Sequence, residues 1–306
     1  MSDANNPPPG DVKEPSPPLV GKIKDWLAQN GYPLEMRVTR MFRTAKCKKV
    51  VQSEFYETTN EKGEPIWREI DVAAQVARTI KGSHPLKPTE GVQFFCDFFF
   101  TCECKNNARA DRPWLVFTDI HAAPTNFPLM MGLPMSGLAM QLMFRVTADR
   151  EFDETTALEF FAPRRVGYGA VQPSFGGGTK PRENYDGAHQ AITSVLSAAN
   201  AKTNVTSGLY KIVRIVLPVV VITAPLYECY LDEHGQIQLE SREEMTMFWR
   251  NPQVGLPDSI VFIVREPAMP AFIEKAKKGF EGVFSFEDDL FAAFRVQEER
   301  REDDAG

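Results

Sequence analysis

Three side chains in the first third of the sequence could together bind a divalent cation and act on a phosphate ester. Glu103 and Lys105 lie two residues apart at the end of an apolar run that begins at Gly91, and Asp71 lies in a polar segment upstream. Because residues i and i+2 of a strand share a face, Glu103 and Lys105 point the same way while Cys104 points into the opposite layer. Two carboxylates and a lysine are the groups that a metal-dependent phosphodiesterase needs.

Each of these groups has an expected role. Two carboxylates with open positions suit Mg²⁺ or Mn²⁺, which prefer oxygen ligands and keep bound waters. The backbone carbonyl of Cys104 is a further candidate ligand, and Lys105 could orient a water or stabilise charge on the phosphate. The alternative is an ordinary ion pair between Glu103 and Lys105 at a sheet edge, and spacing alone favours that alternative.

A helix predicted over residues 34–43 adds a third acid and a basic face. Glu35 lies at the rim of its apolar stripe, so its carboxylate could lean toward the sheet and join a metal site. A solvated acid favoured by the helix dipole is the alternative. Arg37, Arg40 and Arg43 follow round to the exposed side, where they could contact a phosphate backbone or form a solvated face.

The predicted strands allow the two acids of the sheet to meet. Strands are expected over residues 48–58, 66–76 and 91–105. If the second and third form a hairpin, Asp71 lies opposite Glu103 when the turn centres on Lys87. The turn-rich segment 81–88 contains that position, so the geometry permits a shared site.

Composition indicates a soluble globular protein of one or two domains. Of the 306 residues, 43% are hydrophobic and 25% are charged, which is ordinary for that class. The five cysteines are odd in number, form no C-x-x-C and follow no hydrophobic leader, so we expect a reducing cytoplasm and no disulfide framework. Cys96, Cys102 and Cys104 share strand parity, which fits packing beneath a helix better than a thiolate metal site.

Two apolar segments are too short or too interrupted to span a bilayer. Residues 215–224 form a run of only ten, and residues 128–146 are interrupted by Gly132, Pro134, Ser136, Gly137 and Gln141. Both are predicted to be buried elements, the first of them a central strand. We therefore expect no membrane partner.

Charge is distributed unevenly along the chain. The net charge of −6 argues mildly against a general nucleic-acid binder. Residues 286–306, however, hold eight acidic and three basic residues, so this acidic C-terminal tail carries −5 of the total. Residues 37–49 hold six basic residues and no acid. The body is thus close to neutral and has one basic face.

The remaining chain divides into a leader and further elements. Residues 1–18, with six prolines, are expected to be a disordered leader before a domain of residues 19–285. Helices are predicted over 19–30, 186–201 and 270–279, strands over 114–118, 211–224 and 259–264, and a hairpin turn at 232–235. Residues 119–184 show no clear pattern.

Five segments occur in a fixed order along the first 114 residues: GYPLE at 31–35, Phe55-Tyr56, REIDVAA at 68–74, ECK at 103–105 and Pro113-Trp114. This ordered set resembles the restriction-endonuclease-like PD-(D/E)xK nuclease superfamily, in particular bacterial members of unsettled role. The superfamily core is αβββαβ. The resemblance assigns helix 33–43 and strands 48–58, 66–76 and 91–105 to its first four elements. The helix from Asp186 and the strand from Lys211 complete the core, with residues 106–184 as a large insertion.

By this resemblance Asp71 and Glu103 bind the metal, Lys105 is catalytic and Glu35 is the acid of the first core helix. Gln190 matches a glutamine that some members place near the site.

The sequence therefore predicts an α/β fold with a mixed central sheet flanked by helices. The expected function is a Mg²⁺- or Mn²⁺-dependent nuclease that hydrolyses DNA, with RNA as an alternative substrate, by attack of an activated water. One alternative is a non-catalytic nucleic-acid- or protein-binding protein that retains the nuclease fold. A hydrolase of a smaller phosphoester is another. A homodimer is compatible with the sequence.

Overall fold

The computed structural model of the protein describes residues 17–59, 63–87, 89–106, 112–119, 132–148, 159–161, 165–173, 181–203, 211–250 and 258–305. In chain order the elements are α1 (Pro17–Gln29), α2 (Tyr32–Thr44), β1 (Lys48–Thr59), β2 (Pro65–Ser83), β3 (Gly91–Lys105), β4 (Trp114–Thr118), α4 (Gly137–Ala148), η1 (Glu159–Phe161), β5 (Val166–Val171), α5 (Pro181–Thr203), β6 (Lys211–Ile222), β7 (Leu226–Leu231), β8 (Ile237–Arg242), β9 (Glu244–Trp249), β10 (Ser259–Arg265), η2 (Glu266–Ala268), α6 (Met269–Val283) and α7 (Glu287–Ala305).

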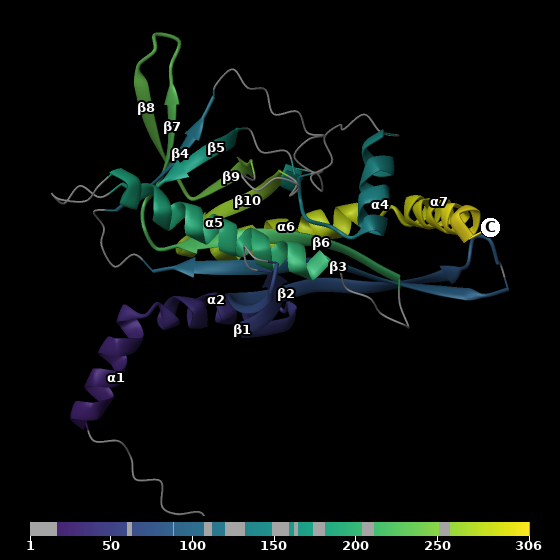
Figure 1. The fold of residues 1–306 in the computed structure, drawn as a ribbon, viewed down its shortest axis with the longest axis horizontal. Helices are drawn as coiled ribbons and strands as arrows, with labels where there is room; N and C mark the ends of the chain where they lie inside the picture. The colour runs from purple at the N-terminus through teal and green to yellow at the C-terminus, as the bar shows by residue number, and fades with distance from the viewer. Residues whose placement is uncertain are drawn as a thin grey trace, which may run out of the picture.

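One mixed sheet holds all ten of these strands, in the order β1-β2-β3-β6-β10-β9-β5-β4-β7-β8. Strands β1, β2 and β3 form an antiparallel meander, after which β3 pairs in parallel with β6 and β6 with β10. Helix α5 covers one face of the sheet, and α2, α4, α6 and α7 contribute to the core on the other (Figure 1). The predicted α/β class with a mixed sheet flanked by helices is confirmed.

The apolar run of β3 is buried because both of its faces are covered. Phe98 and Phe100 pack in the core with α2 and α6, whereas Phe99 packs in the core with α5. Adjacent side chains of a strand point to opposite faces, so a strand between two helical layers needs apolar residues at nearly every position. The neighbouring strand β6 follows the same rule, as the sequence predicted for a central strand. The three cysteines of β3 lie buried in the α2 and α6 core, where packing was expected.

The hairpin of β2 and β3 has the predicted register. Val72 lies opposite Cys102 and Ser83 lies opposite Gly91, which centres the turn on Lys87. The predicted end of β2 at residue 76 was wrong, because the strand continues to Ser83. Polar residues beyond residue 76 interrupt the alternation of apolar and polar side chains, so the sequence pattern did not indicate that the strand continues.

The segment predicted as an insertion, residues 106–184, contributes to the same sheet. Its strand β4 pairs with β7 and its strand β5 with β9, so neither belongs to a separate unit. Helix α4 buries Leu142 and Met143, which confirms a buried element in the described part of the run 128–146. Among the residues with described positions, no helix combines the length and apolar character that crossing a bilayer requires.

The C-terminal end of the chain differs from its predicted role. The segment predicted as an acidic tail, residues 286–306, contains α7, whose Leu290 and Phe294 are buried in the core. Because these side chains are buried, this segment is part of the fold. The predicted leader 1–18 lies outside the described residues except for Pro17 and Pro18, which begin α1.

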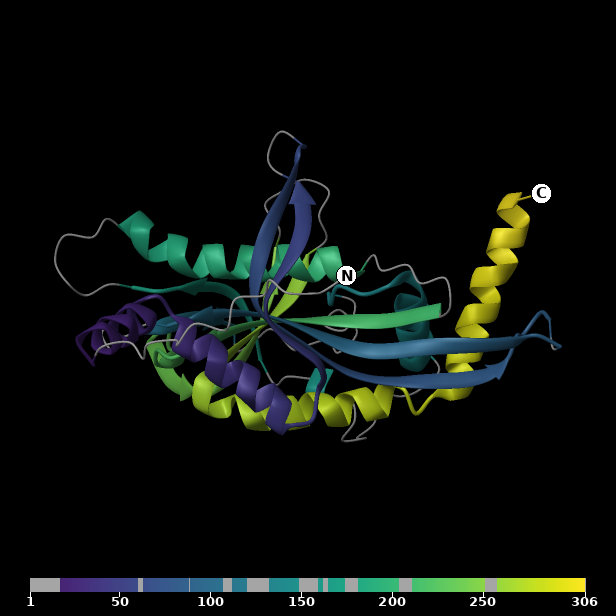
Figure 2. The same cartoon turned by 90° about the horizontal axis from the view of Figure 1, so that it is seen from below.

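The outer half of the β1–β2 hairpin leaves the sheet and crosses α5 (Figure 2). We call this half, residues 54–59 and 65–70, the hairpin arm. It contacts α5 through Tyr56, whose hydroxyl donates to the Ser194 carbonyl at 3.4 Å, and Thr58, whose hydroxyl lies 3.3 Å from that of Ser197. Ser53 precedes the arm with a φ of 57°, an uncommon value for a non-glycine residue.

A buried ion pair joins the central strands. Arg214 of β6 donates from Nη2 to Asp97 of β3 at 2.7 Å, and Gln75 of β2 donates to the same carboxylate at 2.7 Å. Asp97 is fully buried and Arg214 nearly so. A buried charge without its partner is far more costly than the intact pair.

We predict that Arg214→Met destabilises the protein by about 3–5 kcal/mol, because it leaves the Asp97 carboxylate buried without its cation. Replacing all three polar partners at once, with Gln75→Met, Asp97→Leu and Arg214→Met, should bring the stability back to within about 1 kcal/mol of the wild type. Urea unfolding measures both. A triple variant as unstable as the single one would contradict the prediction.

Candidate active site

The site begins where β2 separates from β3. The ladder between these strands is recorded from Val72 opposite Cys102 onward. Beyond that pair the Cys104 amide donates to Oδ2 of Asp71 at 2.6 Å, so a side chain accepts the hydrogen bond that a neighbouring strand would otherwise take. The N–H and C=O of one strand residue point to the same side. The Cys104 carbonyl is therefore also directed toward the side of β3 on which Asp71 lies.

Glu103 and Lys105 face α5 from the same strand. Nζ of Lys105 donates to Oε1 of Glu103 at 2.6 Å, and Oγ of Ser194 donates to Oε2 at 3.1 Å. The ion pair that the alternative predicted is therefore present, at the end of β3 beyond its ladder with β2. Its acid is buried, since Glu103 is only 8% exposed, so the pair is not fully solvated.

A pocket of about 380 Å³ opens above these two residues. Its walls come from three elements: the hairpin arm, the end of β3 and the middle of α5. The lining residues are Arg68, Glu103, Lys105, His189, Gln190, Thr193 and Ser194. Gln190, which the resemblance singled out, thus lies in the same pocket as Glu103 and Lys105, with an exposed side chain.

Glu35 approaches from the opposite face of the sheet, on α2. Its Oε2 accepts a hydrogen bond from Nε2 of Gln52 at 3.1 Å, and the side chain is buried rather than solvated. Burial raises the pKa of Glu35, and the negative charges of Glu69 and Glu103 raise it further, while the Gln52 hydrogen bond lowers it. Glu35 is therefore close enough to the sheet acids to feel their charge.

The two other acids, Glu103 and Glu35, are close enough to Asp71 to affect its pKa. Burial is the largest cause that raises the pKa of Asp71, and the Glu103 and Glu35 carboxylates raise it further. The Cys104 amide and the Lys105 ammonium lower it, and the net result is a pKa of about 7. Carboxylates in a partly buried site repel one another. A cation bound between them would reduce this repulsion and so lower the electrostatic free energy.

The donor set fits a hard cation with few protein ligands. Within the described ranges, no group of three or more His, Cys, Asp or Glu side chains is already arranged to hold a metal ion. Mg²⁺ usually needs only one or two carboxylates and completes its shell with water and substrate oxygens. Asp71, Glu103 and the Cys104 carbonyl supply oxygen atoms of that kind.

The three arginines of α2 are exposed, as the sequence predicted, but they are not equivalent. Arg37 forms an ion pair with Glu266 of η2, with Nη2 lying 3.0 Å from Oε2. This contact ties Arg37 to the body of the protein. Arg40 and Arg43 remain on the exposed side of α2.

Sequence reasoning did not identify several residues of the site. Ser194 and Gln52 hold the Glu103 and Glu35 carboxylates, and Arg68, His189 and Thr193 line the pocket. The helical spacing of His189 with Thr193 and of Gln190 with Ser194 makes a polar stripe on an alanine-rich helix, and this signal could have found them.

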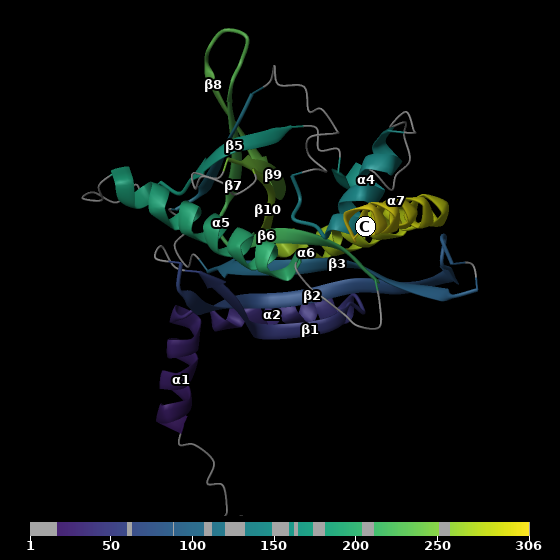
Figure 3. The same cartoon turned by 45° about the vertical axis from the view of Figure 1, so that its right-hand side comes forward.

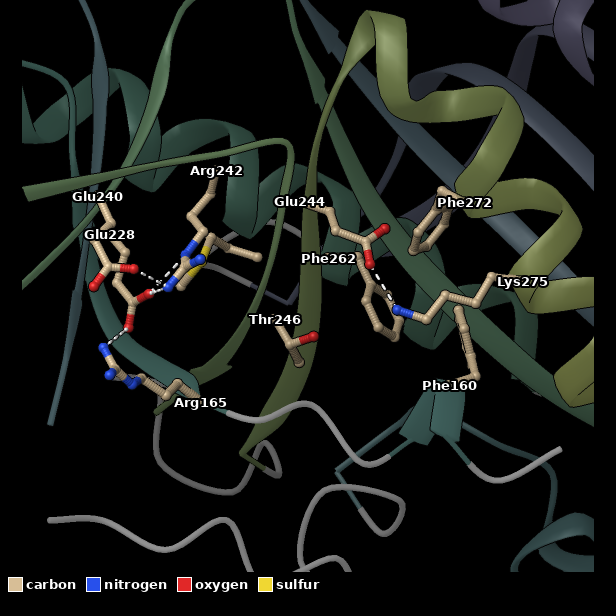
Figure 4. A pocket seen from close by; sticks show the side chains of 11 residues that line it. Phe160, Arg165, Glu228, Glu240, Arg242, Glu244, Thr246, Phe262, Phe272 and Lys275 are labelled. Atoms are coloured by element: carbon tan, nitrogen blue, oxygen red, sulfur yellow. Dashed lines mark hydrogen bonds and ion pairs between the residues drawn. The ribbon is translucent and has the colours of Figure 1, made fainter. Parts of the chain in front are cut away.

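A second pocket, of about 470 Å³, lies over β9 and β10 and holds charges that neutralise one another (Figure 4). Glu228 is buried and accepts hydrogen bonds from Arg165 and Arg242, the second of which also binds Glu240. On the other side of the pocket, Nζ of Lys275 lies 2.6 Å from Oε1 of Glu244. Each charged group that lines this pocket thus has an opposite charge beside it, whereas Asp71 and Glu35 accept their hydrogen bonds from the neutral Cys104 amide and Gln52 side chain.

No family model, curated protein or solved structure matches the chain.

We predict that the contribution of Asp71 to the stability of the metal-free protein falls as the pH rises from about 4 to about 7, because folded Asp71 retains a proton that the unfolded chain releases. Asp71→Asn removes this contribution and keeps an oxygen that can accept from Cys104. The variant should be more stable than the wild type by about 2–4 kcal/mol at pH 8, with little difference near pH 4. Urea unfolding in EDTA across this range tests the prediction, and an unchanged pH dependence would contradict it.

Proposed function

We propose that this protein is a metal-dependent nuclease that hydrolyses DNA phosphodiester bonds by attack of an activated water. The observation that supports it most is the hydrogen bond between Asp71 and the Cys104 amide. This bond holds the Asp71 carboxylate beside Glu103 and Lys105, next to a pocket with room for a phosphodiester group. A carboxylate pair with a lysine is the set that the chemistry requires.

The order of elements supports a restriction-endonuclease-like PD-(D/E)xK core within the larger sheet. The order αβββαβ is formed by helix α2, the meander β1-β2-β3, helix α5 and strand β6. Further elements lie between β3 and α5 in the chain. The strands of this set are neighbours in the sheet, and the two helices lie on opposite faces. On this proposal the remaining strands extend the core on the far side of β6.

The residues of the site have different roles in the proposed reaction. Asp71, Glu103 and the Cys104 carbonyl would hold Mg²⁺ or Mn²⁺. Such a cation, when bound, lowers the pKa of a water and offsets negative charge on the phosphate. Lys105, whose side chain is partly exposed in the pocket, donates to a phosphate oxygen or to the attacking water.

Other groups orient the substrate and the ligands. The amide of Gln190 and the guanidinium of Arg68 offer donors to the phosphate from two walls of the pocket. Ser194 fixes the rotamer of Glu103. Glu35 adds negative charge from the α2 side and so favours a cation at Asp71. The exposed Arg40 and Arg43 attract the DNA backbone.

A non-catalytic binding protein that retains this fold is the second candidate. In its favour, both carboxylate oxygens of Glu103 already accept hydrogen bonds, from Lys105 and Ser194, so the site is closed by its own side chains. The basic surface of α2 would serve such a role equally well.

We predict that the wild type nicks supercoiled plasmid or cleaves labelled single strands with Mg²⁺ or Mn²⁺, and that Lys105→Ala and Asp71→Asn each lower the rate by at least about 100-fold. Lys275→Ala is the matched control, because the ion pair of Lys275 with Glu244 has the same 2.6 Å separation in the second pocket. The control should cleave at the wild-type rate. Equal loss in all three variants would indicate damage to the fold.

Calorimetry with Mn²⁺ separates the candidates. A nuclease binds Mn²⁺ at a site that Glu103→Gln weakens, and a hydrolase of small phosphoesters binds it but leaves polynucleotides intact. A wild type that binds no Mn²⁺, with or without DNA, would refute the nuclease and favour the binding protein.

A further inference from the structure

The outer face of the hairpin arm alternates aromatic and acidic side chains. Phe55 lies opposite Glu69 and Glu57 lies opposite Trp67, so each carboxylate has one ring across the hairpin and another ring two residues along its own strand. Trp67 is 68% exposed, Phe55 is 59% exposed, and both glutamates are exposed. We call this surface of two rings and two acids the aromatic–acidic face.

The aromatic–acidic face is separate from the candidate active site. The inner face of the arm packs on α5 through Tyr56, and Arg68, the only basic residue of the arm, lines the pocket from that inner side. Figure 3 shows α5 and α2 on opposite sides of strands β2 and β3. The outer face of the arm is therefore turned away from α5 and from the pocket.

The two carboxylates of this face have no cation of the same chain beside them. Glu54, the third acid of the arm, pairs with Lys49 and Lys202. By contrast, no ion pair among the residues with described positions includes Glu57 or Glu69. A surface that combines unpaired negative charge with exposed rings repels polyanions and attracts a cation that can also stack.

The spacing of the face fits arginines at alternate positions of an extended chain. A planar guanidinium stacks on an aromatic ring and also pairs with a carboxylate. The ring and the acid of each directly opposed pair have Cβ atoms about 5 Å apart, so one guanidinium reaches both. The pair of Phe55 with Glu69 lies two residues along the strands from the pair of Trp67 with Glu57, which is about 7 Å. Side chains i and i+2 of an extended peptide recur at that same distance.

We propose that the aromatic–acidic face binds an extended, arginine-rich segment of a partner protein with the pattern Arg-x-Arg. One guanidinium stacks on Trp67 and pairs with Glu57, and the other stacks on Phe55 and pairs with Glu69. This role goes beyond the proposed nuclease function and does not depend on it, because the face and the pocket lie on opposite sides of the arm.

Fluorescence anisotropy of a labelled synthetic peptide that carries one Arg-x-Arg pattern tests the proposal. The wild type should bind this peptide at about 0.15 M salt. A peptide with citrulline in place of both arginines keeps the side-chain shape without the charge and should not bind. A peptide with two adjacent arginines should bind more weakly, because adjacent side chains of an extended segment point to opposite faces.

Substitutions in the face should act according to what each side chain contributes. Trp67→Ala should weaken binding of the Arg-x-Arg peptide by about 2- to 30-fold, through loss of the cation–π contact. Glu57→Gln should weaken it by about 2- to 5-fold, as expected for one exposed ion pair. The combination of Glu57→Lys with Glu69→Lys should abolish binding. These side chains are exposed, so thermal unfolding of the variants should match that of the wild type.

Two matched controls separate this face from general attraction. Tyr168→Ala removes an exposed ring of β5, and Asp288→Asn removes an exposed acid of α7. Both variants should bind the peptide as the wild type does. The second control is needed because the net charge of −6 attracts any cationic peptide to some extent.

Four outcomes would overturn the inference. They are absence of peptide binding by the wild type, full affinity in Trp67→Ala, a loss in Asp288→Asn as large as that in Glu57→Gln, and equal binding of the peptides with alternate and adjacent arginines. Self-association that Trp67→Ala abolishes, without binding of the peptide, would make this face an interface between copies and would also overturn it.

Discussion

The hydrogen bond from the Cys104 amide to Asp71 is the interaction on which the site depends. Where β2 leaves β3, a buried amide would lose its acceptor, which costs about 1–3 kcal/mol for an unsatisfied group. The Asp71 carboxylate prevents that loss and is thereby held beside Glu103. The same position removes the carboxylate from water and raises its pKa to about 7. One contact therefore satisfies the backbone amide where the two strands separate and also raises the pKa of the carboxylate in the site.

The site is built across the sheet rather than on one side of it. Glu35 reaches the separation between β2 and β3 from the α2 face, and Ser194 reaches Glu103 from the α5 face. The middle of β3 is buried between two helical layers and carries mainly phenylalanines, so only the end of the strand can expose polar side chains to a ligand. The buried pair of Asp97 and Arg214, farther along the same strands, is satisfied internally and leaves the chemistry to that end.

Local pattern predicted much of this fold, and long-range contacts account for the rest. Alternation and turn residues located β3 and β4 with their observed ends, and the position of Lys87 in the turn predicted the pairing register that brings Asp71 to Glu103. The departure of the hairpin arm at Ser53 was not predictable, since an uncommon φ at a serine has no periodic signature. Nor was the pairing of Arg37 with Glu266, which joins residues 229 positions apart. Assignment to the nuclease superfamily stays a prediction from ordered motifs.

Ser194 has two contacts whose combination matters for how the molecule responds to ligands. Its carbonyl accepts from Tyr56 of the hairpin arm, and its hydroxyl donates to Glu103. The position of the arm and the orientation of the Glu103 carboxylate therefore share one turn of α5. Two binding events that depend on such a shared element are thermodynamically linked, and the coupling acts equally in both directions. A ligand that holds the arm against α5 thus favours one arrangement of Glu103, and a ligand at Glu103 in turn favours one position of the arm.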